Sequence, residues 1–176
     1  MVIRETKRLI LREFVPEDID ALYKLYEDAE HCRYIDGLSV SKGEEKEKLE
    51  SYIQYVYGFY GFGLWAVIEK ESGMLIGRCG LQVEDIGGEG MLEIGYMIGR
   101  PWLRKGYGLE SVRAVLCYAY EETEETKVAA RIDENNAASQ ALAVRAGFKK
   151  QKTISGHGRR TDLFIYSLPK RPWETE

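Results

Sequence analysis

A short stretch near the middle of the chain has the residue types needed to bind an anion. The sequence LRKGYG, Leu103 to Gly108, follows an apolar segment and precedes a helical pattern. Gly106 and Gly108 have no side chains, so backbone amides can approach a ligand closely. The first turn of the helix adds unpaired N–H groups and the positive end of its dipole. With Arg104 and Lys105 beside it, this turn predicts a pyrophosphate-binding site.

The other common phosphate and metal motifs do not occur in this sequence. It contains no GxxxxGK[ST], and GYGLES lacks the third glycine of a dinucleotide fingerprint. It also contains no HExxH, GxSxG or cysteine–histidine cluster, so we expect no metal cofactor. His31 and His157 are isolated from each other in the sequence.

The elements around this turn can be predicted from hydrophobic spacing and capping signals. Apolar residues at helical spacing predict a helix from about Pro16 to Asp28. Ser41 with Glu44 three residues later is a capping box, which predicts the start of a second helix. Further helices are expected from Gly108 to Glu122 and from Asn136 to Ala146, and strands are expected at Leu9–Leu11, Leu64–Lys70, Met74–Val83, Met91–Ile98, Lys127–Ile132, Phe148–Ile154 and Asp162–Leu168.

The order of these elements predicts a mixed α+β domain with antiparallel hairpins and one strand–helix–strand crossover. Thirteen of the 18 glycines lie between Gly58 and Gly108, a segment that is also rich in strand-forming residues. This segment is therefore expected to be a sheet with an unusual backbone, not a flexible linker.

Composition limits the class of protein further. The chain has 176 residues, which predicts one domain over 1–176 with a short C-terminal tail from about residue 169. The 25 basic and 29 acidic residues give a formal charge of -4, so we expect no binding to DNA. No segment has the length and apolarity of a secretory signal or a membrane span, and three scattered cysteines are typical of reduced thiols. We therefore expect a cytoplasmic protein that does not bind membranes.

Several motifs together resemble one superfamily. Gly95 in LEIGYMIG, then LRKGYG, NAAS from Asn136 to Ser139, and AGF from Ala146 to Phe148 occur in the order and spacing of the GNAT N-acetyltransferases. The opening segment RLILREFVPEDIDALYKLY is similar to the branch that includes ribosomal-protein N-terminal acetyltransferases. The resemblance covers nearly the whole chain.

The resemblance implies a central, mostly antiparallel, splayed β-sheet with about four flanking helices, and acetyl-coenzyme A as the acetyl donor. It implies a β-bulge at Glu93–Ile98, which would free backbone amides for the pantetheine arm. It also implies that cofactor contacts come from the backbone of Met97 and Ile98, the phosphate turn (Arg104, Lys105, Gly106, Tyr107, Gly108 and Leu109), Asn136 and Ser139.

Two further residues are candidates for catalysis on this basis. Glu93 is the candidate base for the acceptor amine, with an ordinary structural ion pair as the alternative. The family often has a tyrosine acid at the position of Ala143, so either Ser139 protonates the leaving thiolate or the thiolate leaves without an acid. Tyr34, Trp65, Arg78 and His157 are candidate walls of the acceptor pocket, with a core role as the alternative for Trp65.

Two functions remain open at this point. The first is direct transfer of an acetyl group from acetyl-coenzyme A to a primary amine, on a protein N-terminus or a small molecule. The second is a non-catalytic sensor or interaction module that binds acyl-coenzyme A. The sequence identifies neither the acceptor nor the oligomeric state, for which a homodimer stays open.

Overall fold

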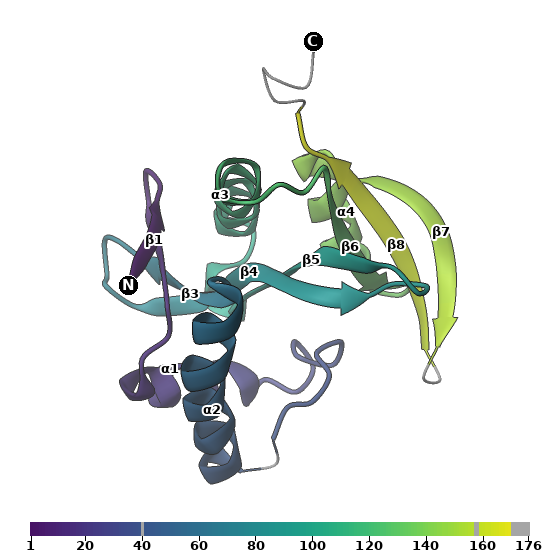
Figure 1. Ribbon diagram of the computed structural model, residues 1–176. Coiled ribbons are helices and arrows are strands. Elements are labelled where there is room, and N and C mark those ends of the chain that lie inside the picture. The colour runs from purple at the N-terminus through teal and green to yellow at the C-terminus, as the bar shows by residue number, and fades with distance from the viewer. Residues whose placement is uncertain (40, 157–158, 170–176) are drawn as a thin grey trace.

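A single mixed β-sheet forms the centre of the molecule (Figure 1). The computed structural model describes residues 1–39, 41–156 and 159–169. Within them the strand order is β1-β2-β3-β4-β5-β6-β8-β7, and every neighbouring pair is antiparallel except β5 and β6. The strands are β1 (Val2–Glu5), β2 (Leu9–Arg12), β3 (Leu64–Glu69), β4 (Leu75–Asp85), β5 (Gly90–Ile98), β6 (Lys127–Asp133), β7 (Lys149–Gly156) and β8 (Arg159–Ser167).

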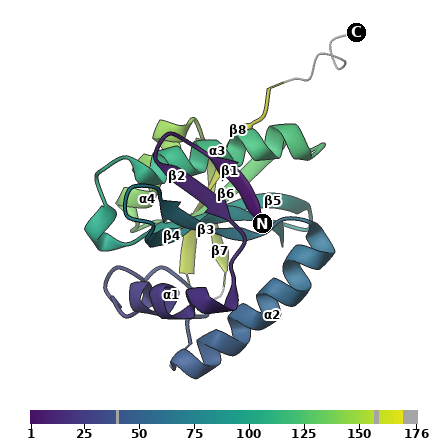
Figure 2. The ribbon, with the colours of Figure 1, turned by 90° about the vertical axis from the view of Figure 1, so that its left-hand side faces the viewer.

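Helices cover both faces of this sheet (Figures 1 and 2). On one face lie α1 (Ile19–Tyr26) and α2 (Lys42–Tyr60), and on the other lie α3 (Tyr107–Glu122) and α4 (Ala137–Ala146). Short 3-10 turns at Pro16–Asp18 and Arg100–Trp102 precede α1 and follow β5. The predicted α+β architecture, its four helices and its crossover are confirmed.

The predicted helix boundaries follow from local backbone chemistry. The Ser41 side chain accepts a hydrogen bond from the Glu44 N–H (3.3 Å) and so caps α2, as its sequence indicates. Gly147 ends α4 in the left-handed region, with φ of 106°. The one strand not expected is β1, whose four residues form the sheet edge and alternate little in hydrophobicity.

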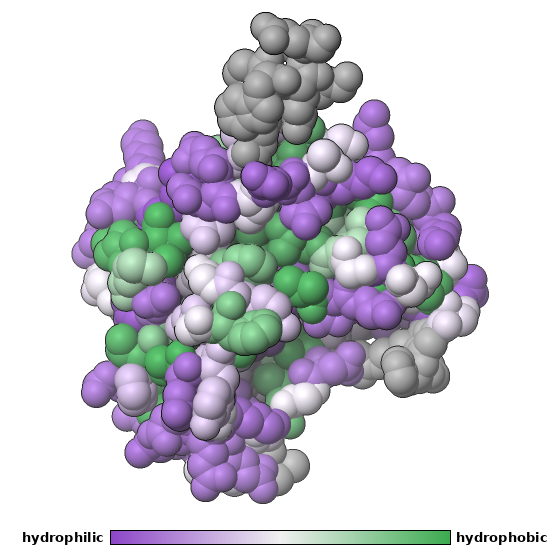
Figure 3. Space-filling view, in the orientation of Figure 1, coloured by the Kyte–Doolittle hydropathy of each residue, from purple (hydrophilic) through white to green (hydrophobic). Residues whose placement is uncertain are grey.

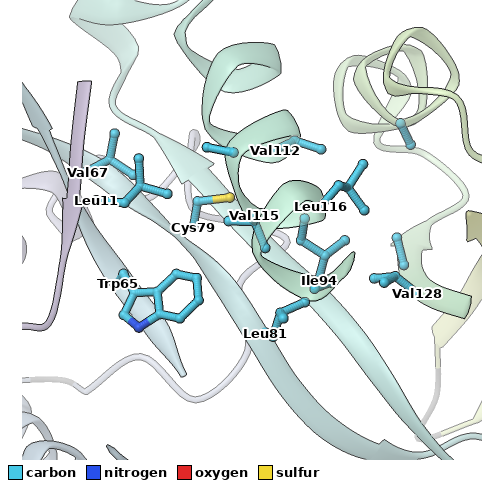
Figure 4. Packing of buried hydrophobic residues seen from close by; sticks show 14 of the residues in the cluster. Leu11, Trp65, Val67, Cys79, Leu81, Ile94, Val112, Val115, Leu116 and Val128 are labelled. Carbon is cyan, nitrogen blue, oxygen red and sulfur yellow. The ribbon is translucent and has the colours of Figure 1, made fainter. Parts of the chain in front are cut away.

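The larger core lies between the sheet and α3. Figure 4 shows Trp65, Cys79 and Leu81 from β3 and β4 directed toward Val112 and Val115 of α3. All five side chains are completely buried. A second cluster fills the opposite face, beneath α1 and α2, and includes Met97 of β5. The two clusters fix the central strands between two helical layers, so the ends of β5 and α3 are held in a defined relation.

Close packing of backbone against backbone explains one of the central glycines. A Cβ atom at Gly80 would lie 2.0 Å from the Gly63 carbonyl oxygen and 2.7 Å from the Leu64 Cα. Both contacts are with main-chain atoms, which cannot move aside without bending β3 away from β4. Gly58, within α2, has no such neighbour, since nothing lies within 4 Å of a Cβ built there.

These two sites give a matched pair of glycine-to-alanine changes. We expect Gly80→Ala to lower the free energy of unfolding by about 3 kcal/mol, because the added methyl group overpacks the β3–β4 contact. We expect Gly58→Ala to raise it by about 0.5–1 kcal/mol, because alanine restricts the unfolded chain and favours the helix. Urea unfolding of both variants measures these changes. Similar stabilities for the two variants would show that the tight β3–β4 approach is not a constraint.

Candidate active site

The sheet opens between β5 and β6. These two parallel strands are paired only at Glu93 and Ala129, after which they diverge. On its other side, β5 pairs with β4 without interruption, from Gly90 opposite Asp85 to Ile98 opposite Gly77. The expected β-bulge at Glu93–Ile98 is therefore wrong, because the register does not shift. The divergence from β6 has the consequence attributed to the bulge, since it leaves one edge of β5 without a neighbouring strand.

Glu93 marks the point where the two strands separate. Its Oε1 accepts the backbone N–H of Arg131 in β6 (3.0 Å), where a regular ladder would use a backbone carbonyl of β5. Its Oε2 accepts Nε (3.0 Å) and Nη2 (2.6 Å) of the same arginine, which also binds Glu84. The Glu93 side chain is 14% exposed. The hydrogen bond from Glu93 is the main reason that the pKa of Arg131 is raised.

The backbone groups on the free edge of β5 can be assigned by alternation. The Gly99 N–H donates to the Ile76 carbonyl of β4, and the Met97 carbonyl oxygen would touch a Cβ at Gly77 of the same strand. Since successive residues of a strand direct their backbone groups to opposite sides, those of Tyr96 and Ile98 face the opening. Of the two backbone contacts expected from the resemblance, Ile98 therefore faces the opening, whereas Met97 faces β4.

The start of α3 lies at the end of this edge. Its N-cap residue, Gly106, has φ of 85° and provides no side-chain cap. The first intrahelical hydrogen bond runs from the Glu110 N–H to the Gly106 carbonyl (3.1 Å). The N–H groups of the three preceding residues, Tyr107, Gly108 and Leu109, are thus outside the helical ladder and available to an anion.

Positive charge surrounds this uncapped helix start. Arg104, with φ of 60°, and Lys105 have exposed side chains. Arg8, from the β1–β2 turn, donates Nη1–H to the Lys105 carbonyl (2.8 Å), and its guanidinium lies 4.4 Å from the centre of the Tyr107 ring. The sequence analysis did not identify Arg8, because 96 residues separate it from the turn that it supports. Backbone amides and nearby cations are the kinds of group that bind an anion.

The start of α4 lies across the opening. The Asn136 side chain accepts the Ser139 N–H (3.2 Å) and so caps this helix, while its Nδ2 group has no hydrogen bond within the described part of the chain. The Ser139 hydroxyl donates to the Tyr96 hydroxyl (2.9 Å), which in turn donates to the Ser139 carbonyl (3.0 Å). Burial raises the pKa of Tyr96 to about 12, so this hydroxyl remains protonated at neutral pH. Ala143 is completely buried in the core and offers no polar group.

The segment that connects α1 to α2 passes beside the opening, on the face of the sheet that these two helices cover. His31 donates Nε2–H to the Ile98 carbonyl (2.7 Å), and the Tyr34 hydroxyl donates to the Asn135 carbonyl (3.0 Å). Tyr34 therefore lies beside the opening, as expected of a pocket wall. Apolar residues gather over the middle of this view of the molecule, between the polar surfaces of α2 and the β7–β8 hairpin (Figure 3).

The other candidate wall residues have different environments. Trp65 is completely buried on the α3 face and packs edge-on against Tyr118, so it has the core role weighed for it and does not line the acceptor pocket. Arg78 is half-buried on the α1–α2 face of β4. His157 lies outside the described residues.

The described residues form neither a metal site nor a membrane-spanning helix. Residues 1–39, 41–156 and 159–169 contain no group of three His, Cys, Asp or Glu side chains that could hold a metal ion. In the same ranges, no helix has both the length and the apolarity needed to cross a membrane.

Comparison with known proteins agrees with this geometry. Residues 8–149 match the family model described as "Acetyltransferase (GNAT) domain". The chain is 34% identical over 150 residues to the uncharacterized protein YkkB of Bacillus subtilis, covering 85% of this chain and 86% of YkkB. It is 27% identical to the uncharacterized N-acetyltransferase p20 of Bacillus licheniformis, covering 96% of each chain.

A solved structure shares the fold at lower sequence identity. An acetyltransferase of Salmonella typhimurium, described as modifying the N-terminal serine of a ribosomal subunit protein, superposes with a TM-score of 0.78 at 15% identity. The match covers 96% of this chain and 100% of that one. The family model spans most of the chain, and the splayed sheet and the uncapped start of α3 agree with it. This protein therefore belongs to the GNAT family of N-acetyltransferases.

Proposed function

We propose that this protein transfers an acetyl group from acetyl-coenzyme A to a primary amine by direct attack, with no covalent enzyme intermediate. The observation that carries the proposal is the uncapped start of α3 beside the free edge of β5. In the same fold, α2 and α4 have side-chain caps from Ser41 and Asn136. A long helix whose first N–H groups lack a cap, with two exposed cations next to them, is suited to a pyrophosphate.

The chain offers donors and acceptors along the length of such a ligand. The N–H groups of Tyr107, Gly108 and Leu109 would hold the pyrophosphate, supported by the side chains of Arg104 and Lys105. The backbone groups of Tyr96 and Ile98 would bind the amide groups of pantetheine as a neighbouring strand would, and Asn136 has a free Nδ2 donor on the opposite side. His31 now donates to the Ile98 carbonyl, so a bound pantetheine would share or replace this contact.

Ser139 is the proposed hydrogen-bond donor to the leaving thiolate, and Tyr96 is the residue that positions it. The serine hydroxyl rotates freely about its Cβ–O bond, so it can turn from the Tyr96 oxygen toward a thiolate in the opening. The Tyr96 hydroxyl can then rotate so that its O–H donates to the Ser139 Oγ instead of the Ser139 carbonyl. This hydrogen bond makes the Ser139 hydroxyl a better donor. Because a thiol has a pKa near ~8.5, a hydrogen-bond donor is sufficient and a strong acid is unnecessary.

Glu93 is the proposed base for the acceptor amine, acting through water. A carboxylate has about four lone-pair positions, and Arg131 occupies three of them, which leaves one on Oε1. An α-amine of pKa near ~7.8 needs less help from a base than an alkylamine of pKa near ~10.4.

The alternative function is a sensor that binds acyl-coenzyme A without turnover. The observations that favour it are the buried Ala143 in place of a tyrosine and the three hydrogen bonds that Glu93 already accepts from Arg131. A thiol-release assay over a panel of amines and peptides separates the two functions. Tight binding of acetyl-coenzyme A with no thiol released from any acceptor would establish the sensor.

A substitution in the first turn of α3 tests the proposed phosphate site. We expect Gly108→Glu to weaken acetyl-coenzyme A binding at least about 100-fold, because the carboxylate repels the pyrophosphate and covers the amides. The same substitution at Gly58, in open space on α2, should leave the affinity unchanged. Isothermal titration calorimetry measures both affinities.

A second variant keeps this test valid if Gly108→Glu misfolds, since its Cβ would lie 2.5 Å from the Leu142 side chain. The double variant Arg104→Glu and Lys105→Glu changes exposed side chains and should weaken binding about 10- to 100-fold. Wild-type affinity in this double variant and in a folded Gly108→Glu protein would remove the assignment of the phosphate site.

The second prediction tests whether Tyr96 acts through Ser139. We expect Ser139→Ala to lower kcat about 10- to 100-fold and Tyr96→Phe to lower it about 5- to 10-fold, with unchanged acetyl-coenzyme A affinity. Because Tyr96 acts only by positioning Ser139, Tyr96→Phe should have no further effect in the Ser139→Ala background. Steady-state rates with the best acceptor of the panel measure this cycle, with Tyr118→Phe as the control. Effects that multiply independently would argue against the positioning role.

The third prediction concerns Glu93. With an alkylamine acceptor, we expect Glu93→Gln to lower kcat about 100-fold at pH 7 and less than about 10-fold at pH 9. At pH 7 almost none of an amine of pKa near ~10.4 is neutral, whereas a few per cent is neutral at pH 9, so the base matters less there. Glutamine can still accept the Arg131 N–H, which limits structural damage. An equal loss at both pH values would mean that Glu93 only holds β5 to β6.

A further inference from the structure

Arg78 stands on the α1–α2 face of the sheet, next to the free edge of β5. It is paired with Met97 across the β4–β5 ladder, and Met97 separates Tyr96 from Ile98, whose backbone groups face the opening. Its guanidinium lies 5.3 Å from the centre of the Tyr26 ring, at the end of α1. The side chain is half-buried, so it is partly shielded from water and still partly exposed to it.

No anion balances this guanidinium within the described part of the chain. No carboxylate oxygen lies within 4.0 Å of Arg78 there, and its side chain makes no hydrogen bond to another described residue. The other partly buried arginines among the described residues differ, since each binds a carboxylate through charge-assisted hydrogen bonds: Arg4 with Glu121, Arg8 with Glu110, and Arg12 with Asp18. None of the five N–H donors of Arg78 is therefore used by a described residue.

A second donor beside Arg78 is also unused. The Tyr26 hydroxyl is buried and has no hydrogen-bond partner among the described residues. Burial raises the pKa of Tyr26 to about 12, so this group is a neutral donor at physiological pH. A buried polar group without a partner costs free energy, so the Tyr26 hydroxyl has a reason to bind water, an ion or a ligand group that reaches it. Arg78 and Tyr26 thus form a set of donors with no acceptor.

An acidic group near Tyr26 is already engaged. Glu45 of α2 is buried, and its Oε2 accepts the Ser39 N–H (3.2 Å). Its charge contributes to raising the pKa of Tyr26, which places it near that ring, but it forms no ion pair with Arg78. Glu45 therefore does not occupy the position beside Arg78 that an anion would take.

The location relates these donors to the proposed reaction. An acceptor that enters from the α1–α2 side brings its amine to the opening between β5 and β6. Paired residues on neighbouring antiparallel strands have Cα atoms about 5 Å apart, so Arg78 is one strand away from the backbone that faces the opening. A group only a few bonds from the amine can reach the guanidinium.

We propose that Arg78, assisted by Tyr26, binds a carboxylate of the acceptor. The acceptor is then a primary amine that carries a carboxylate a few bonds away, as in an amino acid. This inference rests on the proposed acetyl transfer and narrows its acceptor. The same carboxylate chemistry is present in the acidic side chain of a peptide N-terminus, and the test has an arm for each source.

The test compares acceptors with and without this carboxylate, with each rate expressed per neutral amine because the two amines differ in pKa. Thiol release from acetyl-coenzyme A is measured for glycine, β-alanine and 4-aminobutyrate, each against its carboxamide, and for glutamyl-alanine amide against glutaminyl-alanine amide. We expect kcat/KM for at least one carboxylate to exceed that for its carboxamide about 10- to 100-fold, the range of a charge-assisted hydrogen bond. Preference within the amino acids or within the peptides identifies the source.

Variants of Arg78 link this preference to the residue. Arg78→Met keeps an unbranched apolar stem over Tyr26 and should abolish the preference, by lowering the carboxylate rate while the carboxamide rate stays unchanged. Arg78→Lys keeps the charge and should retain part of the preference. Equal use of carboxylate and carboxamide by the wild type would overturn the inference, as would an equal loss of both rates in Arg78→Met.

A binding measurement distinguishes failure of this inference from failure of the proposed function. Calorimetry with the same amino acids and carboxamides, in the presence of coenzyme A, requires no turnover. Wild-type protein should bind the carboxylate at least about 10-fold more tightly, and Arg78→Met should bind both equally. Absence of coenzyme A binding would overturn the proposed function, and this carboxylate–carboxamide comparison would still decide the role of Arg78.

Discussion

The separation of β5 from β6 is the constraint on which the rest of the structure depends. A sheet normally satisfies every backbone group of a central strand through both neighbours, yet β5 has lost one of them beyond Glu93. The Glu93 carboxylate limits this separation, because it accepts both the backbone and the side chain of Arg131. Beyond Glu93, β6 continues into α4 and pairs with β8, so a few hydrogen bonds position a large part of the molecule on the far side of the opening.

Backbone groups, more than side chains, supply the proposed cofactor site. The edge of β5 and the uncapped start of α3 both present N–H groups that the fold does not use. The two are adjacent because only the short turn at Arg100–Trp102 and the segment up to Gly106 connect them. Such a site tolerates many side chains, which is consistent with a fold shared at 15% identity. Specificity for the acceptor must then come from side chains on the opposite face, among which Arg78 has unused donors.

Local signals in the sequence predicted most of the elements, including the start of α3 after the glycine-rich turn. The Ser41 cap, the glycine after α4 and the alternating strands act within a few residues, so the sequence pattern is sufficient to recognise them. The β-bulge was wrong for a physical reason, since a bulge and a divergence both free amides and differ only in the register of the neighbouring strand. Trp65 was ambiguous because strand residues at the same spacing can face either helical layer.

Long-range contacts could not be predicted in this way. Tyr96 and Ser139 are 43 residues apart, and neither residue type indicates that their hydroxyl groups meet across the opening. Arg8 supports the phosphate turn from the first hairpin, and Glu93 binds a strand that follows two further elements. The sequence also does not show that Arg78 has no carboxylate partner among the described residues, because this depends on which carboxylates bind the other arginines. These features depend on tertiary packing, and they belong to the candidate site more than to the fold.

Acetyl-coenzyme A is proposed to bind to the free edge of β5 and to the start of α3. Titration of ¹⁵N-labelled protein with acetyl-coenzyme A, followed by amide chemical shifts, tests this claim at the atoms concerned. The amides of Tyr96, Ile98, Tyr107, Gly108 and Leu109 should show the largest changes, and those of β1 should stay unchanged. Saturable shifts confined to other parts of the sheet, with these five amides unaffected, would contradict the account.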